Sequence, residues 1–218
     1  SALADKALKG ASFDTLRTVT ADGLALEPLY GAAAPASAGR PLLAPWQVVA
    51  RVDADAGSSV QARTDLENGS TALALTFAGA ASAHGRGLTA CDVAGIDAAL
   101  EGGLLRMVPL HVEAGRAARP VLASLAALFE ARGERPAELH AGLDPVGSFL
   151  ATGTMLDWSI TVPRLADMVC GFGSLGVPGS AIRADGRMVF EAGGTAVQEL
   201  AFALASLAAM VRALDGEG

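Results

Sequence analysis

Six polar residues near the ends of apolar runs are the first candidates for chemistry: Asp53, Thr76, His111, Glu113, Asp144 and Asp185. They lie at the predicted carboxyl ends of strands, where parallel α/β folds bind their ligands. If the strands of His111 and Asp144 are neighbours, the two side chains could form a general acid/base pair or supply two metal ligands. A lone histidine on a strand is more often a hydrogen-bonded packing residue, so both interpretations stay open.

These residues belong to a regular alternation of strand-like and helix-like stretches. Strands are predicted at 47–52, 71–77, 104–112, 138–143 and 180–189. Helices are predicted at 58–68, 92–100, 119–132, within 146–168 and at 194–214, after a short helical stretch at 3–16. Such alternation implies a parallel sheet. Five βα units fit an open doubly wound sheet or part of an eight-stranded barrel, and the lack of GxGxxG or GxxxxGK[ST] after any strand favours a TIM-type (β/α) barrel.

Composition narrows the function classes. The 218 residues carry a net charge of -7 and are 51% hydrophobic, which predicts one globular domain without the basic patch that nucleic-acid binding requires. Charges, Pro or Gly interrupt every long apolar run, and the N-terminus does not resemble a secretory signal. We therefore expect a cytoplasmic protein without a membrane span. Cys91 and Cys170 lie far apart, with no CxxC and no adjacent histidine, which predicts buried thiols and no metal site.

Four stretches resemble the methylmalonyl-CoA mutase family. Residues 20–30, T-A-D-G-L-A-L-E-P-L-Y, are similar to the family's T-x-D-G-x-x-x-x-P-L-Y arm, and 44–46, A-P-W, stand where the family has Arg-Pro-Trp. The third stretch is D-L-E-N-G at 65–69, and the fourth is E-A-G-G-T at 191–195, continuing to Ala201. Their order and spacing cover essentially the whole chain.

The resemblance implies a barrel that holds acyl-CoA along its axis and is capped by adenosylcobalamin from a separate domain. The family's reaction is a radical rearrangement between methylmalonyl-CoA and succinyl-CoA. The resemblance implies an N-terminal arm and linker over residues 1–43 and a partial barrel over 44–218. The last three βα units and the cobalamin domain have no counterpart before Gly218, so the sequence is expected to be part of a longer protein, with a naturally short protein as the alternative.

Several positions depart from the pattern of catalytic members. The family's Tyr-His pair falls on Arg187 and Met188, and its strand tyrosine falls on Arg51. Ala44 replaces the arginine expected at the CoA phosphates, and the family's Gln-Asn-Asp is Gly142-Leu143-Asp144. By resemblance we expect no catalytic residue here, and we keep Tyr30, Gln47 and Asp144 as candidate substrate contacts.

This pattern resembles the non-catalytic small subunit of the mutase. It implies a catalytic large subunit as partner, with acyl-CoA and adenosylcobalamin in the holoenzyme and no cobalamin binding by this chain alone. Two alternatives remain: a self-sufficient barrel enzyme using His111, Asp144 and Glu113, or a CoA-binding module without turnover. An unfinished barrel would have two free edges and an uncovered inner face. We expect that face to be apolar, carrying Val48, Leu75 and Val108 or their neighbours, and we expect an oligomer.

Overall fold

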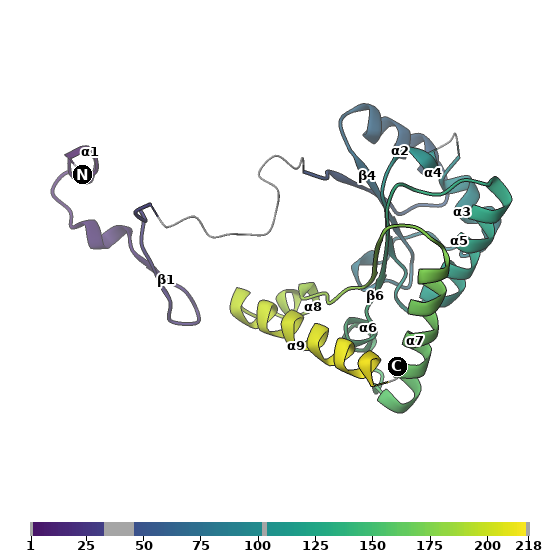
Figure 1. Cartoon of the computed structure of the whole chain (residues 1–218). Coiled ribbons are helices and arrows are strands. Elements are labelled where there is room, and N and C mark those ends of the chain that lie inside the picture. Colours follow the sequence, from purple (N-terminus) through teal and green to yellow (C-terminus); the bar gives the residue numbers. More distant parts are fainter. Residues whose placement is uncertain (1, 33–45, 102–103, 217–218) are drawn as a thin grey trace.

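The computed structural model describes residues 2–32, 46–101 and 104–216 (Figure 1). Its centre is a parallel sheet whose five strands pair in chain order. The strands are β3 (Val49–Val52), β4 (Ala72–Thr76), β5 (Leu110–Glu113), β6 (Leu139–Leu143) and β7 (Gly179–Ile182). The predicted α/β class with five βα units is confirmed. Within the described residues the sheet does not close into a barrel, and β3 and β7 form its edges.

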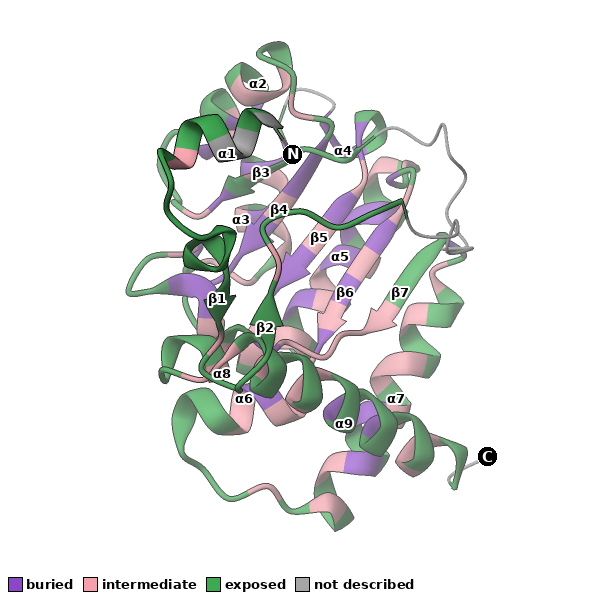
Figure 2. Cartoon of the chain, turned by 90° about the vertical axis from the view of Figure 1, so that its left-hand side faces the viewer, coloured by how far each residue is buried: buried purple, intermediate pink, exposed green. Residues whose placement is uncertain are grey.

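Helices follow each strand of the sheet. The larger ones are α2 (Ser58–Glu67), α3 (Val93–Ala99), α5 (Ala118–Arg132), α6 (Pro145–Thr152), α7 (Trp158–Ser174) and α9 (Ala196–Asp215). Shorter turns of helix are η2 (Ala81–Ala83), α4 (Leu104–Met107), η3 (Gly115–Ala117) and α8 (Arg187–Glu191). Helices α2, α3, α5 and α7 cover one face of the sheet, whereas α8 and α9 lie at the carboxyl ends of the strands (Figure 1 and Figure 2). The main apolar core joins the sheet to α2, α3 and α5.

The two faces of the sheet differ because side chains alternate along each strand. Leu73 and Leu75 of β4 are fully buried in the core shared with the helices, whereas Ala74 between them faces the other side. Bands of buried and partly buried residues alternate along β5 and β6 in Figure 2. The prediction that Leu75 lies on the inner barrel face is therefore wrong, because the strand register turns it towards the helices.

Two predicted strands are shorter than their apolar runs. The run 104–112 begins with α4, and only Leu110–Glu113 pairs as β5. Leu104 and Leu105 are buried in the core as residues of a helix. Pro109 lacks the backbone N–H that a longer strand would donate to its neighbour. The run 180–189 leaves the sheet after Ile182 and becomes α8 at Arg187. An apolar run alone does not distinguish a buried helical turn from a strand.

The N-terminal arm has little structure of its own. It consists of α1 (Ala2–Leu8), η1 (Phe13–Leu16) and a hairpin of β1 (Thr18–Val19) and β2 (Ala25–Leu26). The helix expected over 3–16 is broken, because Lys9 and Gly10 adopt positive φ angles of 49° and 92°. Figure 1 shows the tip of the hairpin beside the start of α9. There the Thr195 hydroxyl donates a 2.7 Å hydrogen bond to Asp22.

Helix α9 has an uncovered apolar stripe. By length and composition alone it could cross a membrane, and most of its apolar stretch is exposed in this structure. Its exposed apolar residues follow a spacing of three and four: Val197, Leu200, Leu204, Leu207 and Val211. Such spacing places them on one side of the helix, as in an amphipathic helix that packs against a partner.

Candidate functional site

One row of residues crosses all five strands on the face away from the core helices. Arg51, Ala74, His111, His140 and Ser180 are successive register partners from β3 to β7. Since partners in a parallel sheet point to the same side, these side chains share one surface. The surface is polar or small rather than apolar. The expected apolar inner face is therefore absent from the described strands.

His111 and His140 form the centre of that row. Their rings stack with centroids 4.5 Å apart. Burial, then the neighbouring His140 and Arg183, lower the pKa of His111. His111 Nε2 lies 3.3 Å from Gln47 Oε1, and His140 Nδ1 lies 2.9 Å from Ser180 Oγ. Both histidines thus have structural partners, which matches the packing interpretation of His111.

Glu113 is the hub of an ionic cluster at the carboxyl ends of the strands. Its Oε1 accepts hydrogen bonds of 2.9 Å from both Arg183 and Arg187, and its Oε2 accepts one from the Ser82 hydroxyl. Burial alone would raise the pKa of Glu113. The Ser82 hydrogen bond and the two arginine charges outweigh it, so the pKa is lowered.

The rest of this cluster balances its charge. Arg187 Nε donates to Asp185 at 2.8 Å, and the Arg187 pKa is raised, first by the hydrogen bond to Asp185. On β3, Arg51 lies 3.0 Å from Asp53 and donates to the Ser82 carbonyl at 2.7 Å. We call this set the mouth cluster; its members are Arg51, Asp53, Ser82, Glu113, Arg183, Asp185 and Arg187. Three guanidinium groups thereby meet three carboxylates.

Asp144 belongs to a different environment from His111. Its Oδ1 accepts from Gly147 N at 2.8 Å, capping α6, and its Oδ2 accepts from Asp185 N at 3.0 Å. Burial raises its pKa, and these two hydrogen bonds only partly offset the effect. His111 pairs with His140, four residues before Asp144, or about 13 Å along an extended strand. Of the two interpretations that the sequence left open, this geometry supports packing and does not bring His111 and Asp144 together as an acid/base pair.

A bulge in β6 helps to separate the two. The register shifts between His140 and Leu143, and Gly142 has a φ of +59°, with a Cβ position only 2.2 Å from the Val112 carbonyl. A side chain at Gly142, such as the family's glutamine, would collide with β5.

Two cavities border the mouth cluster. One, of about 20 Å³, lies among Glu113, Asp144, Arg183, Asp185 and Met188, which is room for about one water molecule. The other, of about 250 Å³, is lined by Arg51, Asp53 and the start of α2. The cluster therefore leaves little space at the carboxyl ends of β5 and β7 and more space at that of β3.

The remaining predicted contacts lie elsewhere. Tyr30 is 66% exposed, and its hydroxyl accepts from Glu27 N within the arm. Gln47 bridges His111 and Glu138 at the opposite end of the strands. Ala44 lies outside the described residues. The structure therefore does not bring Tyr30, Gln47 and Asp144 into one site.

Two members of the mouth cluster, Ser82 and Arg183, were not predicted. Ser82 stands in a run of small residues after β4, and Arg183 directly follows β7. Only the position of Arg183 after a strand could have indicated a role. In the described part of the chain, no three His, Cys, Asp or Glu side chains group to hold a metal ion. Both cysteines are free, and Cys170 is exposed rather than buried as expected.

Comparison with known proteins agrees with the motifs. The family model described as methylmalonyl-CoA mutase matches residues 45–218. The chain is 35% identical over 228 residues to the methylmalonyl-CoA mutase small subunit of Streptomyces virginiae. The alignment covers 95% of this chain and 35% of that protein. The chain thus spans about a third of the length of its curated relative.

Proposed function

The chain belongs to the methylmalonyl-CoA mutase family, and on that premise we propose that it is a non-catalytic small-subunit segment. In this proposal it assembles with a catalytic large subunit that interconverts methylmalonyl-CoA and succinyl-CoA. The name of the Streptomyces relative supports the subunit assignment. The partner, the substrate and the reaction are part of the proposal.

The observation that carries the proposal is the bonding of Arg187. This residue stands where catalytic members are expected to have the tyrosine of a Tyr-His pair, and it is held by Glu113 and Asp185. A guanidinium whose pKa is raised further by these partners does not exchange a proton near neutral pH. Met188 replaces the histidine and has no proton to transfer. Arg187 therefore stabilises the end of the sheet, and neither position supplies a group that transfers a proton near neutral pH.

Arg51 supports the same conclusion on the opposite strand. Where the family resemblance predicts a tyrosine, Arg51 pairs with Asp53 and with the Ser82 carbonyl. No phenol is available at this position to shield a radical. Arg51 and Arg187 thus both stand where catalytic members are expected to have a tyrosine, and both are held by neighbouring residues. This supports a non-catalytic role for the chain.

The fit to the family's cofactor is poor. Adenosylcobalamin supplies the radical chemistry of the mutase when bound to the holoenzyme. The family resemblance links cobalt to a histidine in Asp-x-His-x-x-Gly, and none of the three histidines has that context. His84 pairs with Glu191, and His111 stacks on His140. We therefore propose no cobalt ligand from this chain and derive no step through the cofactor.

The row of residues that crosses the five strands supports one contribution of the chain to an acyl-CoA channel, which is to line it. Ala74, His111, His140 and Ser180 present small and hydrogen-bonding groups on the face that a complete barrel would enclose. Amide groups of a pantetheine arm are matched by such side chains. The proposed contribution is lining and support, not turnover.

The test is assembly followed by activity. The chain is purified alone and together with a catalytically intact large subunit, and succinyl-CoA formation is measured with adenosylcobalamin present. We expect no turnover by the chain alone, co-elution with the large subunit, and a more active or more heat-stable enzyme in the mixture. Turnover by the chain alone would contradict the proposal. Tight CoA binding without co-elution would instead favour a CoA-binding module.

A further inference from the structure

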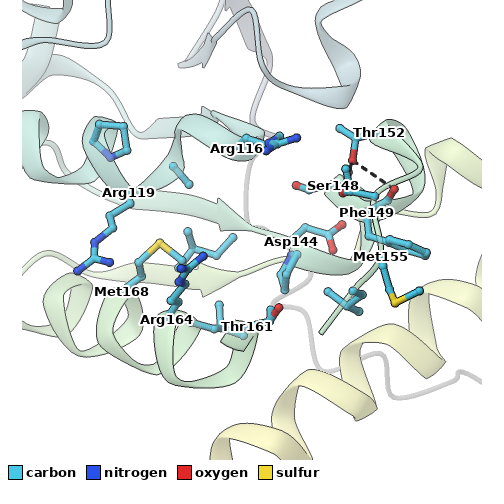
Figure 3. Close-up of a pocket in the computed structure, with 18 residues that line it drawn as sticks. Arg116, Arg119, Asp144, Ser148, Phe149, Thr152, Met155, Thr161, Arg164 and Met168 are labelled. Atoms are coloured by element: carbon cyan, nitrogen blue, oxygen red, sulfur yellow. Dashed lines mark hydrogen bonds between the residues drawn. The ribbon is translucent and has the colours of Figure 1, made fainter. Parts of the chain in front are cut away.

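A larger pocket lies beside the mouth cluster, between α5, α6 and α7. Its volume is about 510 Å³, within the range of pockets that bind small molecules. Figure 3 shows its two ends: Arg119 and Arg164 flank Met168 at one end, and Phe149 and Met155 lie at the other. Arg116, from η3, lies along one wall.

The arginines of this pocket differ from those of the mouth cluster. Arg116, Arg119 and Arg164 are exposed, and none has an ion pair or a side-chain hydrogen bond with another described residue. In contrast, Arg51, Arg183 and Arg187 are all paired with carboxylates. Three uncompensated cations on one pocket are unexpected in a chain with a net charge of -7. They make the pocket locally positive.

The acidic residue in the lining does not neutralise them. Asp144 is the one carboxylate among the lining residues. Its two oxygens are engaged by the backbone N–H groups of Gly147 and Asp185, and burial raises its pKa. The guanidinium groups therefore remain free for an external anion.

The floor of the pocket is apolar. Leu165 is buried beneath it and Met168 is partly buried. Phe149 is partly covered, and Met155 is 92% exposed. Aromatic and methionine side chains adapt to flat or irregular apolar groups. The pocket thus offers charge at one end and apolar surface at the other.

We propose that this pocket binds a small organic anion. A phosphate or carboxylate group would lie between Arg119 and Arg164, whose planar guanidinium groups donate paired hydrogen bonds to such oxygens. An apolar or aromatic body would lie over Met168 and extend towards Phe149. The site is separate from the mutase positions Arg51, Arg187 and Met188, and it does not depend on the proposed partner.

The binding test uses the complete 218-residue chain and the fluorescent anion 1-anilinonaphthalene-8-sulfonate, which combines a sulfonate with an aromatic body. We expect saturable binding that weakens with added salt and that inorganic pyrophosphate displaces. The double substitution Arg119→Gln with Arg164→Gln should raise the Kd at least about tenfold, because two charge-assisted contacts are lost. The matched control, Arg63→Gln, removes another unpaired arginine, on α2 outside the pocket, and should change the Kd less than about twofold.

Two outcomes would overturn the proposal. One is an unchanged Kd in the double variant, which would place the dye on another apolar surface such as the α9 stripe. The other is an equal loss in Arg63→Gln, which would indicate general attraction to positive charge. Since Arg119 and Arg164 are exposed and unpaired, both variants should keep the circular dichroism spectrum and melting temperature of the parent. Failure of the large-subunit assay would not affect this test, which measures the chain alone.

Discussion

At the scale of single residues, Glu113 holds the mouth of the sheet together. It collects two arginines and a serine from three separate segments, while its side chain is only 11% exposed. A carboxylate with these partners stabilises the fold because the arginines are positioned to compensate its loss of water. The same bonds engage both carboxylate oxygens of Glu113.

Replacing Glu113 by glutamine tests that role. Glu113→Gln should lower the free energy of unfolding by about 1–3 kcal/mol at pH 7, measured by urea denaturation. The folded pKa of Glu113 is lowered, so its contribution is present above the unfolded value of about 4.3. It is lost as pH falls through the folded pKa. The difference between the variant and the parent should therefore shrink below about pH 4.

The control for this prediction is Glu130→Gln on α5. Glu130 is 78% exposed and pairs with Arg135, so its loss should change the free energy of unfolding by less than about 1 kcal/mol. Equal losses in the two variants, or a Glu113 effect that persists at low pH, would contradict the hub role.

The stacked histidines allow a second prediction. Burial and then the charge of His140 lower the pKa of His111, so His140→Gln should raise that pKa. Proton NMR titration of the His111 ring measures it directly. His84→Gln is the control, because His84 pairs with Glu191 on another surface and should leave the His111 pKa unchanged. A His111 pKa that does not rise in His140→Gln would show that the stack has no electrostatic effect.

The roles of these residues follow from contacts that spacing along the chain cannot reveal. Glu113 and Asp144 were recognisable as residues at strand ends. Their partners were not, because Ser82 lies 31 positions from Glu113 and Arg183 lies 70 positions from it. The bulge at Gly142 could not be predicted from the sequence either, although the register shift that it causes changes the side of the sheet on which Asp144 lies.

At the scale of elements, the strands and long helices were predictable where their signals were local. Helix α5 ends at Gly133 in a left-handed conformation, and α9 begins with a capping box at Thr195 and Gln198; both are common boundary signals. The errors fell on apolar runs, such as 104–112, where burial is compatible with either structure. In those runs, contacts with distant parts of the chain determine whether the residues form a helix or a strand, and these contacts cannot be inferred from the local sequence pattern.

Thr195 joins two elements and can be tested in both roles. It caps α9 through Gln198 N, and its hydroxyl donates to Asp22 of the arm. Thr195→Ala should cost about 1 kcal/mol of unfolding free energy and speed proteolysis of the arm. Asp22→Ala should speed the proteolysis with little change in unfolding free energy.

Thr195→Ser keeps the hydroxyl and serves as the control for both measurements. It should behave like the parent in denaturation and in limited trypsin digestion. Unchanged digestion of the arm in Asp22→Ala would show that the contact between the arm and α9 does not hold the arm in place.

At the scale of the whole molecule, the family motifs describe a spatial arrangement. The arm motif contains Asp22 and the fourth motif contains Thr195, and these two residues meet although they lie 173 positions apart. The match over residues 45–218 covers the whole sheet. Of the barrel expected from the resemblance, the described residues form five parallel strands in an open sheet with β3 and β7 at its edges.

The prediction of an oligomer now rests on different surfaces. The face expected to be apolar carries His111, His140 and Ser180, so it does not need a cover to avoid water. Among the described strands, β3 and β7 remain the edges of the sheet, where backbone groups have no neighbouring strand to pair with. The apolar stripe of α9 exposes more apolar surface than the polar face of the sheet; its Leu200 and Leu204 are each 60% exposed.

We therefore expect the isolated chain to form a dimer or larger assembly in which a second copy covers α9. The alternation of three and four residues between exposed apolar positions is the spacing by which two helices pack along a seam. Leu200→Gln with Leu204→Gln should shift the assembly towards monomer at low micromolar concentration, measured by light scattering. Val60→Gln on α2, where the parent residue is 69% exposed, is the control and should leave the assembly unchanged. A stable parental monomer would refute the prediction, whereas an oligomer unaffected by the α9 variant would assign the interface to the strand edges or the arm.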